Sequence, residues 1–325
     1  MKLIPISKYD YHTMQLAKPV VDSSYRMLLA AGHAIHPKYL ERLKALGISH
    51  LIVEDRESRG ITLEEMLDMS IWMETVRELE RIYTQVKKEN KICVHSLKKL
   101  ANNLVREVKY RKVLIVAPST IISRELLLYA HLVNVTLLSL MVGKALMYTD
   151  IQLRELAVGC LLHDLGKIFT DREAEHPQAG FEFIRKEREI NLLSAHVAFQ
   201  HHETLDGSGY PRKMRGEDIL EFAQICGLTN LYENMISREN VPPHEAMEYV
   251  MTLHGRKYVE HVVKAFCSTV PTYPPGSKVY LHSEEKAIVT KITSHIHRPV
   301  IRIISSGEEI DLSEQPNLMI TGLAE

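Results

Sequence analysis

The sequence predicts a mainly α-helical protein: a helical bundle core, preceded by a small α+β module and followed by a small β-domain. Long apolar faces at helical spacing recur from Ser119 to about Ser268, as a bundle core requires. After a stretch rich in proline and glycine at 271–276, segments rich in β-branched residues alternate with polar turns. The 325 residues suffice for two or three domains. We expect an α+β module at 1–60, a helical connector at 61–118, the helical domain at 119–270 and the β-domain at 271–325.

The N-terminal module is expected to contain a hairpin, a helix and a strand. Residues 22–24, Asp-Ser-Ser, lie between two apolar stretches and favour a hairpin turn. Pro37 to Leu46 has the pattern of a helix, with Gly47 where a C-cap belongs. Ser49 to Val53 is expected to form a strand. The sequence assigns no chemistry to this module.

The connector is expected to be helical from Thr62 to about Lys112. Thr62 is a suitable N-cap, and two glutamates follow in the first turn. Apolar residues recur at helical spacing at Leu67, Ile71, Met73 or Val76, Leu79, and Ile82 or Tyr83. This stripe fits either the seam of a coiled-coil homodimer or a connector helix packed within one chain.

The last two domains differ in their periodicity. In the helical domain, apolar faces predict helices over Arg124–Met147 and Leu153–Leu165. In the β-domain, strands are expected at Ser277–Leu281, Lys286–Ile292 and Val300–Ile304. A strand meander or a small barrel would accommodate them.

Composition narrows the partners and the compartment. The net charge is -1, from 40 basic and 41 acidic residues, which argues against a grip on nucleic acid polymers or anionic membranes. A small anionic ligand on a local basic cluster stays open. No apolar run is expected to reach the ~18 residues of a membrane span, and the N-terminus lacks a signal-peptide core. We therefore expect a cytoplasmic protein with reduced thiols at Cys93, Cys160, Cys226 and Cys267.

The chemistry of the chain is concentrated in its histidines and their order. His163 and Asp164 stand side by side at the end of an apolar helix, where they can hold a divalent metal, and the carboxylate can bridge to a second. A lone histidine such as His131 is more often a core residue than a ligand. The downstream candidates are His176-Pro177, His201-His202-Glu203 and Asp206-Gly207-Ser208-Gly209-Tyr210-Pro211. The ordered set, in a helical context, is what points to a metal site.

This ordered set resembles the HD-GYP family, whose members hydrolyse cyclic di-GMP, over about residues 120–268. The resemblance implies an HD-type bundle that holds two divalent ions, Fe, Mn or similar. In the family pattern, Asp164 bridges the two ions. The implied ligands of the first ion are His131, His163, Asp164 and Asn230, and those of the second are Asp164, His176, His201 and His202.

The resemblance also implies catalytic and substrate-binding residues. A metal-bound hydroxide would attack phosphorus, with Asp164 in the metal bridge and Lys167 beside the phosphate, to yield the linear dinucleotide or GMP. The implied substrate-binding residues are Gly209, Tyr210, Pro211 and Arg215. The Asp206–Pro211 segment is also a good turn on any fold, and the basic residues after it can equally form a solvated turn.

Three departures from the family pattern leave two hypotheses of different class. Asn230 stands where the family has an aspartate, so the first metal position is expected to be weak or empty unless Glu233 compensates. The loop between Lys167 and His176 is short, and the usual Arg-Pro-Tyr stretch is reduced. The chain is therefore a phosphodiesterase, or a degenerate HD-GYP module that binds a cyclic dinucleotide or a protein partner without turnover. An HD hydrolase of another phosphorylated substrate is a third possibility. The flanking modules are candidate docking sites for protein partners.

Overall fold

The computed structural model describes residues 1–324, which form two compact units. The helical unit comprises residues 67–116 and 128–270. The mixed unit comprises residues 1–66 and 117–127 together with the chain from 271 onward. The mainly α fold class is confirmed. The four predicted segments are thus distributed over two units, and their independence as domains stays a proposal.

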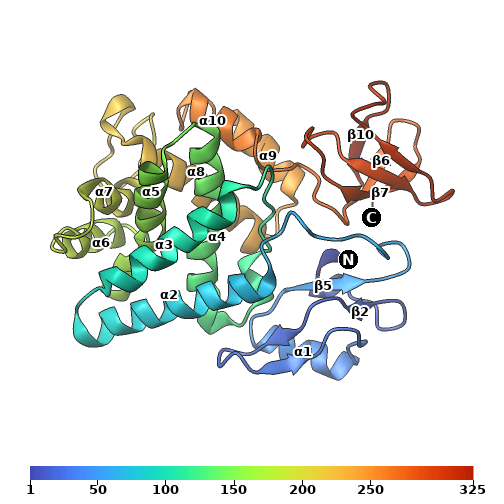
Figure 1. Ribbon diagram of the computed structural model, residues 1–325, viewed down its shortest axis with the longest axis horizontal. Coiled ribbons are helices and arrows are strands. Elements are labelled where there is room, and N and C mark those ends of the chain that lie inside the picture. Colours follow the sequence, from blue (N-terminus) through green and yellow to red (C-terminus); the bar gives the residue numbers. More distant parts are fainter. Residues whose placement is uncertain (325) are drawn as a thin grey trace. The chain divides into compact units, whose positions relative to one another are not determined.

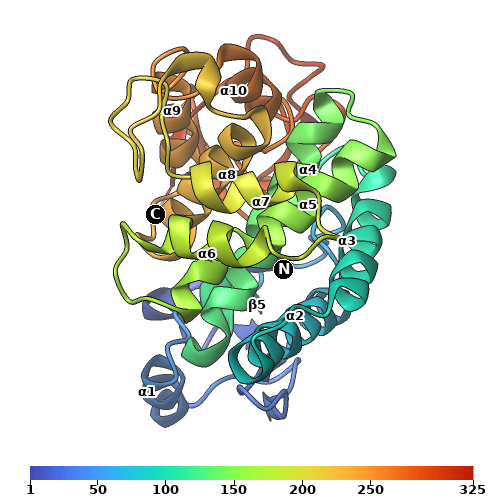
Figure 2. The same cartoon turned by 90° about the vertical axis from the view of Figure 1, so that its left-hand side faces the viewer.

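The helical unit is a bundle built around the most apolar helix of the chain (Figures 1 and 2). Its helices are α2 (Met69–Glu89), α3 (Val94–Lys109), α4 (Leu127–Ala145), α5 (Asp150–Leu162), α6 (His176–Ile184), α7 (Leu192–Gln200), α8 (Glu221–Ser237), α9 (Pro243–Thr252) and α10 (Glu260–Cys267). Side chains of α4, α5 and α7 to α10 form one continuous apolar core. Such a core fixes the ends of α5 and α7, where the histidines lie.

The connector is two helices rather than one, and it begins later than Thr62. Asp68 caps α2, because its side chain accepts a hydrogen bond from the Ser70 amide at 2.8 Å. Asn90, with a left-handed φ of 53°, ends α2, and α3 then packs alongside it (Figure 2). The predicted stripe is mostly buried within this single chain, with Val76 and Leu79 fully enclosed. The packed-connector alternative therefore describes the structure.

The mixed unit contains the N-terminal elements expected from the sequence. β1 (Lys2–Pro5), β5 (His50–Glu54) and β2 (Gln15–Leu16) form a sheet in the order β1-β5-β2. The predicted hairpin is β3 (Val20–Val21) with β4 (Met27–Leu29), and the predicted helix is α1 (Pro37–Ala45). Gly47 has a φ of +83°, and an added Cβ would lie 2.9 Å from the Cβ of Arg124. Glycine is required there by both backbone and space.

The C-terminal part of the mixed unit is a five-stranded antiparallel sheet in the order β10-β6-β7-β8-β9. Its strands are β6 (Lys278–Leu281), β7 (Lys286–Lys291), β8 (Val300–Ile303), β9 (Glu309–Asp311) and β10 (Ile320–Leu323). The three predicted strands are confirmed. The last two were missed because they are short and contain no buried residue, so no apolar alternation marks them.

One helix corrects the expectation about apolar runs. Arg124–Ala145 is long and apolar enough to span a membrane by length and composition, with a mean hydropathy of 1.8 over its best window. However, 83% of that window is buried inside the described structure. A helix at the centre of a bundle is apolar all round and passes the same test. All four cysteines are free in the structure, and the reduced, cytoplasmic state of the protein stays a prediction.

Candidate metal centre

The predicted ligands come together at the ends of three helices and near the start of a fourth. His163 caps the end of α5, and Asp164 follows it before the short 3₁₀ turn η4 (Leu165–Ile168). His176 opens α6, and His201 caps the end of α7. His131 lies on α4. Helix ends are short of backbone partners and tightly positioned, which suits residues that must converge on one point.

Two clusters share Asp164. One comprises Asp164, His176, His201 and His202, and the other comprises His131, His163 and Asp164. Within each cluster, one ligand atom from every residue lies within 4.8 Å of the others. Six of the seven predicted metal ligands are thus brought together, in the two groups that the family pattern implies.

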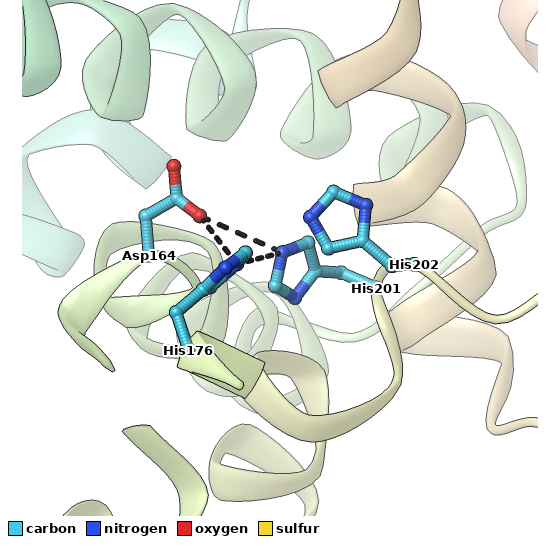
Figure 3. A group of neighbouring side chains, drawn as sticks. All are labelled: Asp164, His176, His201 and His202. Atoms are coloured by element: carbon cyan, nitrogen blue, oxygen red, sulfur yellow. Dashed lines mark hydrogen bonds and ion pairs between the residues drawn. The ribbon is translucent and has the colours of Figure 1, made fainter. Parts of the chain in front are cut away.

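The carboxylate of Asp164 turns one oxygen toward each cluster. Its Oδ1 lies 3.1 Å from His176 Nε2 and 3.6 Å from His201 Nε2, and these two nitrogens are 3.3 Å apart (Figure 3). Its Oδ2 lies 3.7 Å from His163 Nε2. His202 stands beside His201, with ring centroids 4.1 Å apart. A shared carboxylate of this kind can bridge two ions.

Backbone carbonyls fix the tautomers of two histidines. His163 Nδ1 lies 2.8 Å from the Cys160 oxygen, and His201 Nδ1 lies 3.0 Å from the Ala198 oxygen. A carbonyl only accepts, so both rings carry their proton on Nδ1 and turn a lone pair on Nε2 toward Asp164. Lone pairs facing a carboxylate call for a cation between them. His163 Nε2 and Asp164 Oδ1 are buried without a hydrogen bond, so these residues fit a metal ion.

Burial also sets the charge states that a metal needs. Desolvation holds the pKa of His163 well below its usual range and lowers the pKa of His201 and of His202. Burial alone would raise the pKa of Asp164, but its imidazole neighbours and Lys167 hold it well below the usual range. Near neutral pH, His163, His201 and His202 are therefore neutral imidazoles and Asp164 is an ionised carboxylate.

A buried carboxylate that the sequence only hinted at stands behind His131. Glu233 hydrogen-bonds His131 Nδ1 through Oε2 and accepts from Ser237 Oγ at 2.6 Å through Oε1. Burial would raise the pKa of Glu233, but His131 and these donors lower it to about 2. The signal in the sequence was its spacing, three residues after Asn230 on one helix. A carboxylate behind a histidine orients the ring and raises its basicity.

Asn230 and Lys167 have partners of their own. The Asn230 Oδ1 accepts a hydrogen bond from Asn234 Nδ2 at 3.0 Å, one turn further along α8. Lys167, in η4, donates through Nζ to Asp164 Oδ2 at 2.7 Å. The Lys167 ammonium therefore lies at the carboxylate that both clusters share.

Glu203 anchors the backbone that follows the Asp206–Pro211 segment. This buried carboxylate accepts the backbone amides of Arg212 at 2.7 Å and Met214 at 2.9 Å. Sequence analysis missed this role, although the position directly after His201-His202 was visible. The Tyr210 ring stacks on the His202 ring, with centroids 4.4 Å apart and planes at 19°.

The four predicted substrate-binding residues do not share one position. Gly209 is buried, and an added Cβ would lie 2.3 Å from the His202 oxygen, so only glycine fits. Tyr210 reaches the cluster through its stack on His202, and its bond to Pro211 is cis. Arg215 is exposed and folds over Gly207, where an added Cβ would meet its Nε at 2.5 Å. Gly209 and Tyr210 thus lie against His202, whereas Arg215 lies on the exposed turn at Gly207.

Comparison with known proteins defines the class of this site. Residues 115–261 match the family model of the HD domain. This part of the chain is therefore similar to HD domains, and the resemblance to the HD-GYP family indicated by the motifs is confirmed.

Two curated relatives and one solved structure are similar to this chain. A cyclic di-GMP phosphodiesterase of Pseudomonas aeruginosa is 29% identical over 181 residues, covering 50% of this chain and 44% of that protein. One of Thermotoga maritima is 29% identical over 164 residues, covering 44% and 45%. The chain thus spans less than half the length of these relatives. An HDG"Y"P protein from Bdellovibrio bacteriovorus is similar in fold, with a TM-score of 0.50 and 18% identity over 82% of this chain and 98% of that chain.

Proposed function

We propose that this protein is a metal-dependent phosphodiesterase that hydrolyses cyclic di-GMP to the linear dinucleotide or GMP. The observation that carries the proposal is Asp164, a buried carboxylate shared by two histidine clusters. The relatives named as cyclic di-GMP phosphodiesterases support the choice of substrate.

Two divalent ions, Fe, Mn or similar, would polarise the phosphate and lower the pKa of the attacking water. The chain would hold them unequally. Asp164 with His176, His201 and His202 offers three imidazoles and a charge to the second ion. His131, His163 and Asp164 offer the first ion only two imidazoles, with the neutral Asn230 in the place of an anion. A titration with Zn²⁺ is therefore expected to show two unequal steps.

Residues around the clusters would handle the substrate. Lys167 Nζ, already 2.7 Å from Asp164, can neutralise charge that develops on a phosphoryl oxygen. Burial and the nearby Glu173 raise the pKa of Tyr210, so its phenol stays protonated and can donate. Gly209 packs closely on the His202 backbone and so keeps the neighbouring Tyr210 beside the histidines, while the exposed Arg215 could bind a phosphate oxygen.

A second candidate function follows from Asn230. Its oxygen is engaged by Asn234, and an amide brings no charge to the first position. An HD-GYP module with one functional ion would bind the nucleotide or a protein partner without cleaving it. A protein partner could dock on the mixed unit, and a homodimer through α2 would have to use the face that is not buried within this chain.

Metal analysis and a turnover assay distinguish the two functions. Protein purified without chelator is analysed for metal and then incubated with cyclic di-GMP under Mn²⁺ or Fe²⁺, with chromatography of the products. We expect GMP or the linear dinucleotide from the wild type and from His95→Ala, an exposed histidine of α3, and none from His176→Ala. Binding without cleavage by the metal-loaded wild type would favour the degenerate module instead.

A further inference from the structure

A buried polar chain connects the only tryptophan of the protein to the first metal position. Trp72 Nε1, on α2, donates to Asn134 Oδ1 at 2.9 Å. Asn134 Nδ2, on α4, donates to Glu233 Oε1 at 3.2 Å. Glu233 then holds His131 Nδ1 through its other oxygen. All four side chains are at most 3% exposed. This chain of hydrogen bonds therefore links three helices, α2, α4 and α8.

This carboxylate lacks a cation of its own. Within residues 1–324, His131 is the sole ion-pair partner of Glu233, and no lysine or arginine pairs with it. A buried charge is expensive unless it is compensated, and the hydrogen bonds from His131, Asn134 and Ser237 only partly do so. Because Nδ1 of His131 is taken by Glu233, its free nitrogen is Nε2, the one left to face His163 and Asp164. An ion on that nitrogen would be the missing positive charge.

We propose that Glu233 is the positioning residue of the first metal position. It fixes the His131 ring and delivers, through that imidazole, the negative charge that Asn230 does not provide. Asn134 hydrogen-bonds both this carboxylate and Trp72. Binding of an ion at the first position is therefore expected to change the environment of Trp72 on α2. This inference rests on the metal centre of the proposed function but not on catalysis.

The test is a titration with Zn²⁺ in the absence of nucleotide. Binding is measured by calorimetry and, separately, by the fluorescence emission of Trp72. Carboxylates behind metal-binding histidines typically change metal affinity 10–100-fold when removed. We expect Glu233→Gln to weaken the weaker step at least about tenfold and to leave the tighter step within about twofold. Glu233→Asp should recover part of the loss. The control is Ser139→Ala, which removes another buried polar group of α4, bonded to Thr229 at 2.7 Å, and should change neither step.

Trp72 emission provides a measurement that needs no variant. In the wild type, the emission should change with the weaker step and not with the tighter one. Emission that follows the tighter step, or a Glu233→Gln protein with both affinities unchanged or both weakened alike, would overturn the inference.

The outcomes separate this inference from the proposed function. A wild type that binds two ions and shows the Glu233 effect, yet does not cleave cyclic di-GMP, removes the function and keeps the positioning role. If the wild type cleaves the nucleotide but Glu233→Gln binds metal like the wild type, the proposed function is kept and the positioning role is removed. A wild type that binds no Zn²⁺ in either step removes both.

Discussion

Gly166→Ala should dismantle the second metal position through backbone contact alone. Gly166 lies in η4, and a Cβ added there would be 1.9 Å from the His176 carbonyl oxygen and 2.8 Å from the Gly180 amide nitrogen. Real Cβ contacts are essentially never shorter than 3.0 Å, so the carbonyl must retreat by at least 1.1 Å, the difference between 3.0 and 1.9 Å. Metal–ligand distances tolerate only about 0.2 Å. We therefore expect the tighter Zn²⁺ step to weaken by at least about tenfold.

The same collision should cost stability, because overpacking in a well-packed core typically costs about 1–3 kcal/mol. Calorimetry of metal binding and thermal unfolding measure the two effects. The control is Gly322→Ala in β10, where the described chain has no atom within 4 Å of the added carbon. If Gly166→Ala bound Zn²⁺ and unfolded like the control, the contact between η4 and α6 would not position His176.

Three further predictions test the site and the mixed unit. Asp164→Ala should strip metal from both positions and His131→Ala from only one, as measured by elemental analysis; equal loading of the wild type and Asp164→Ala would contradict the shared carboxylate. Asn230→Asp should tighten the weaker step and speed cleavage of cyclic di-GMP, a tenfold gain being about 1.4 kcal/mol off the barrier. Burial lowers the pKa of His50 from 6.5 to about 4, which favours its neutral form in the fold. The contribution of His50 to the free energy of unfolding is therefore fully present above pH 6.5 and decreases as the pH falls toward 4. At pH 5 this loss is about 2 kcal/mol. His50→Gln, which can keep the hydrogen bond to Thr120, should flatten this profile in circular dichroism melts.

The elements that sequence analysis located correctly are those whose signal is local. The helix at Pro37–Ala45 has its start and its glycine stop in the sequence, and its boundaries agree with expectation within a residue. The start of α2 differs from the expectation, because Thr62 and Asp68 are equally good N-caps in the sequence. Only the packing of the following turns determines that the helix begins after Asp68. The break at Asn90 was missed for the same reason, since the apolar stripe continues across it into α3.

In the site, too, the residues found from the sequence are those that belong to contiguous motifs. Three motifs are contiguous in the sequence: His163-Asp164, His176-Pro177 and His201-His202. The fold brings the histidines of all three to the carboxylate of Asp164. Glu203 was not recognised as a support, and Glu233 was named only as a residue that could compensate for Asn230, because their partners are set by the tertiary structure. Glu233 meets a histidine 102 positions away, across two packed helices, and no spacing rule along one chain encodes that contact.

The contrast between Asn230 and Glu233 bears on whether the proposed metal centre turns over its ligand. Both lie on α8, one turn apart, and the sequence shows only that the first has lost a charge. The structure adds that a charge is present behind His131, fully buried and without a basic side chain to neutralise it. A charge behind an imidazole strengthens the imidazole as a ligand but does not occupy a coordination site. The first ion would then be held with an open position where the family aspartate sits, and a site with open coordination suits exchange with water or a phosphate oxygen. The loss at Asn230 is therefore compatible with an enzyme whose first ion is weakly held.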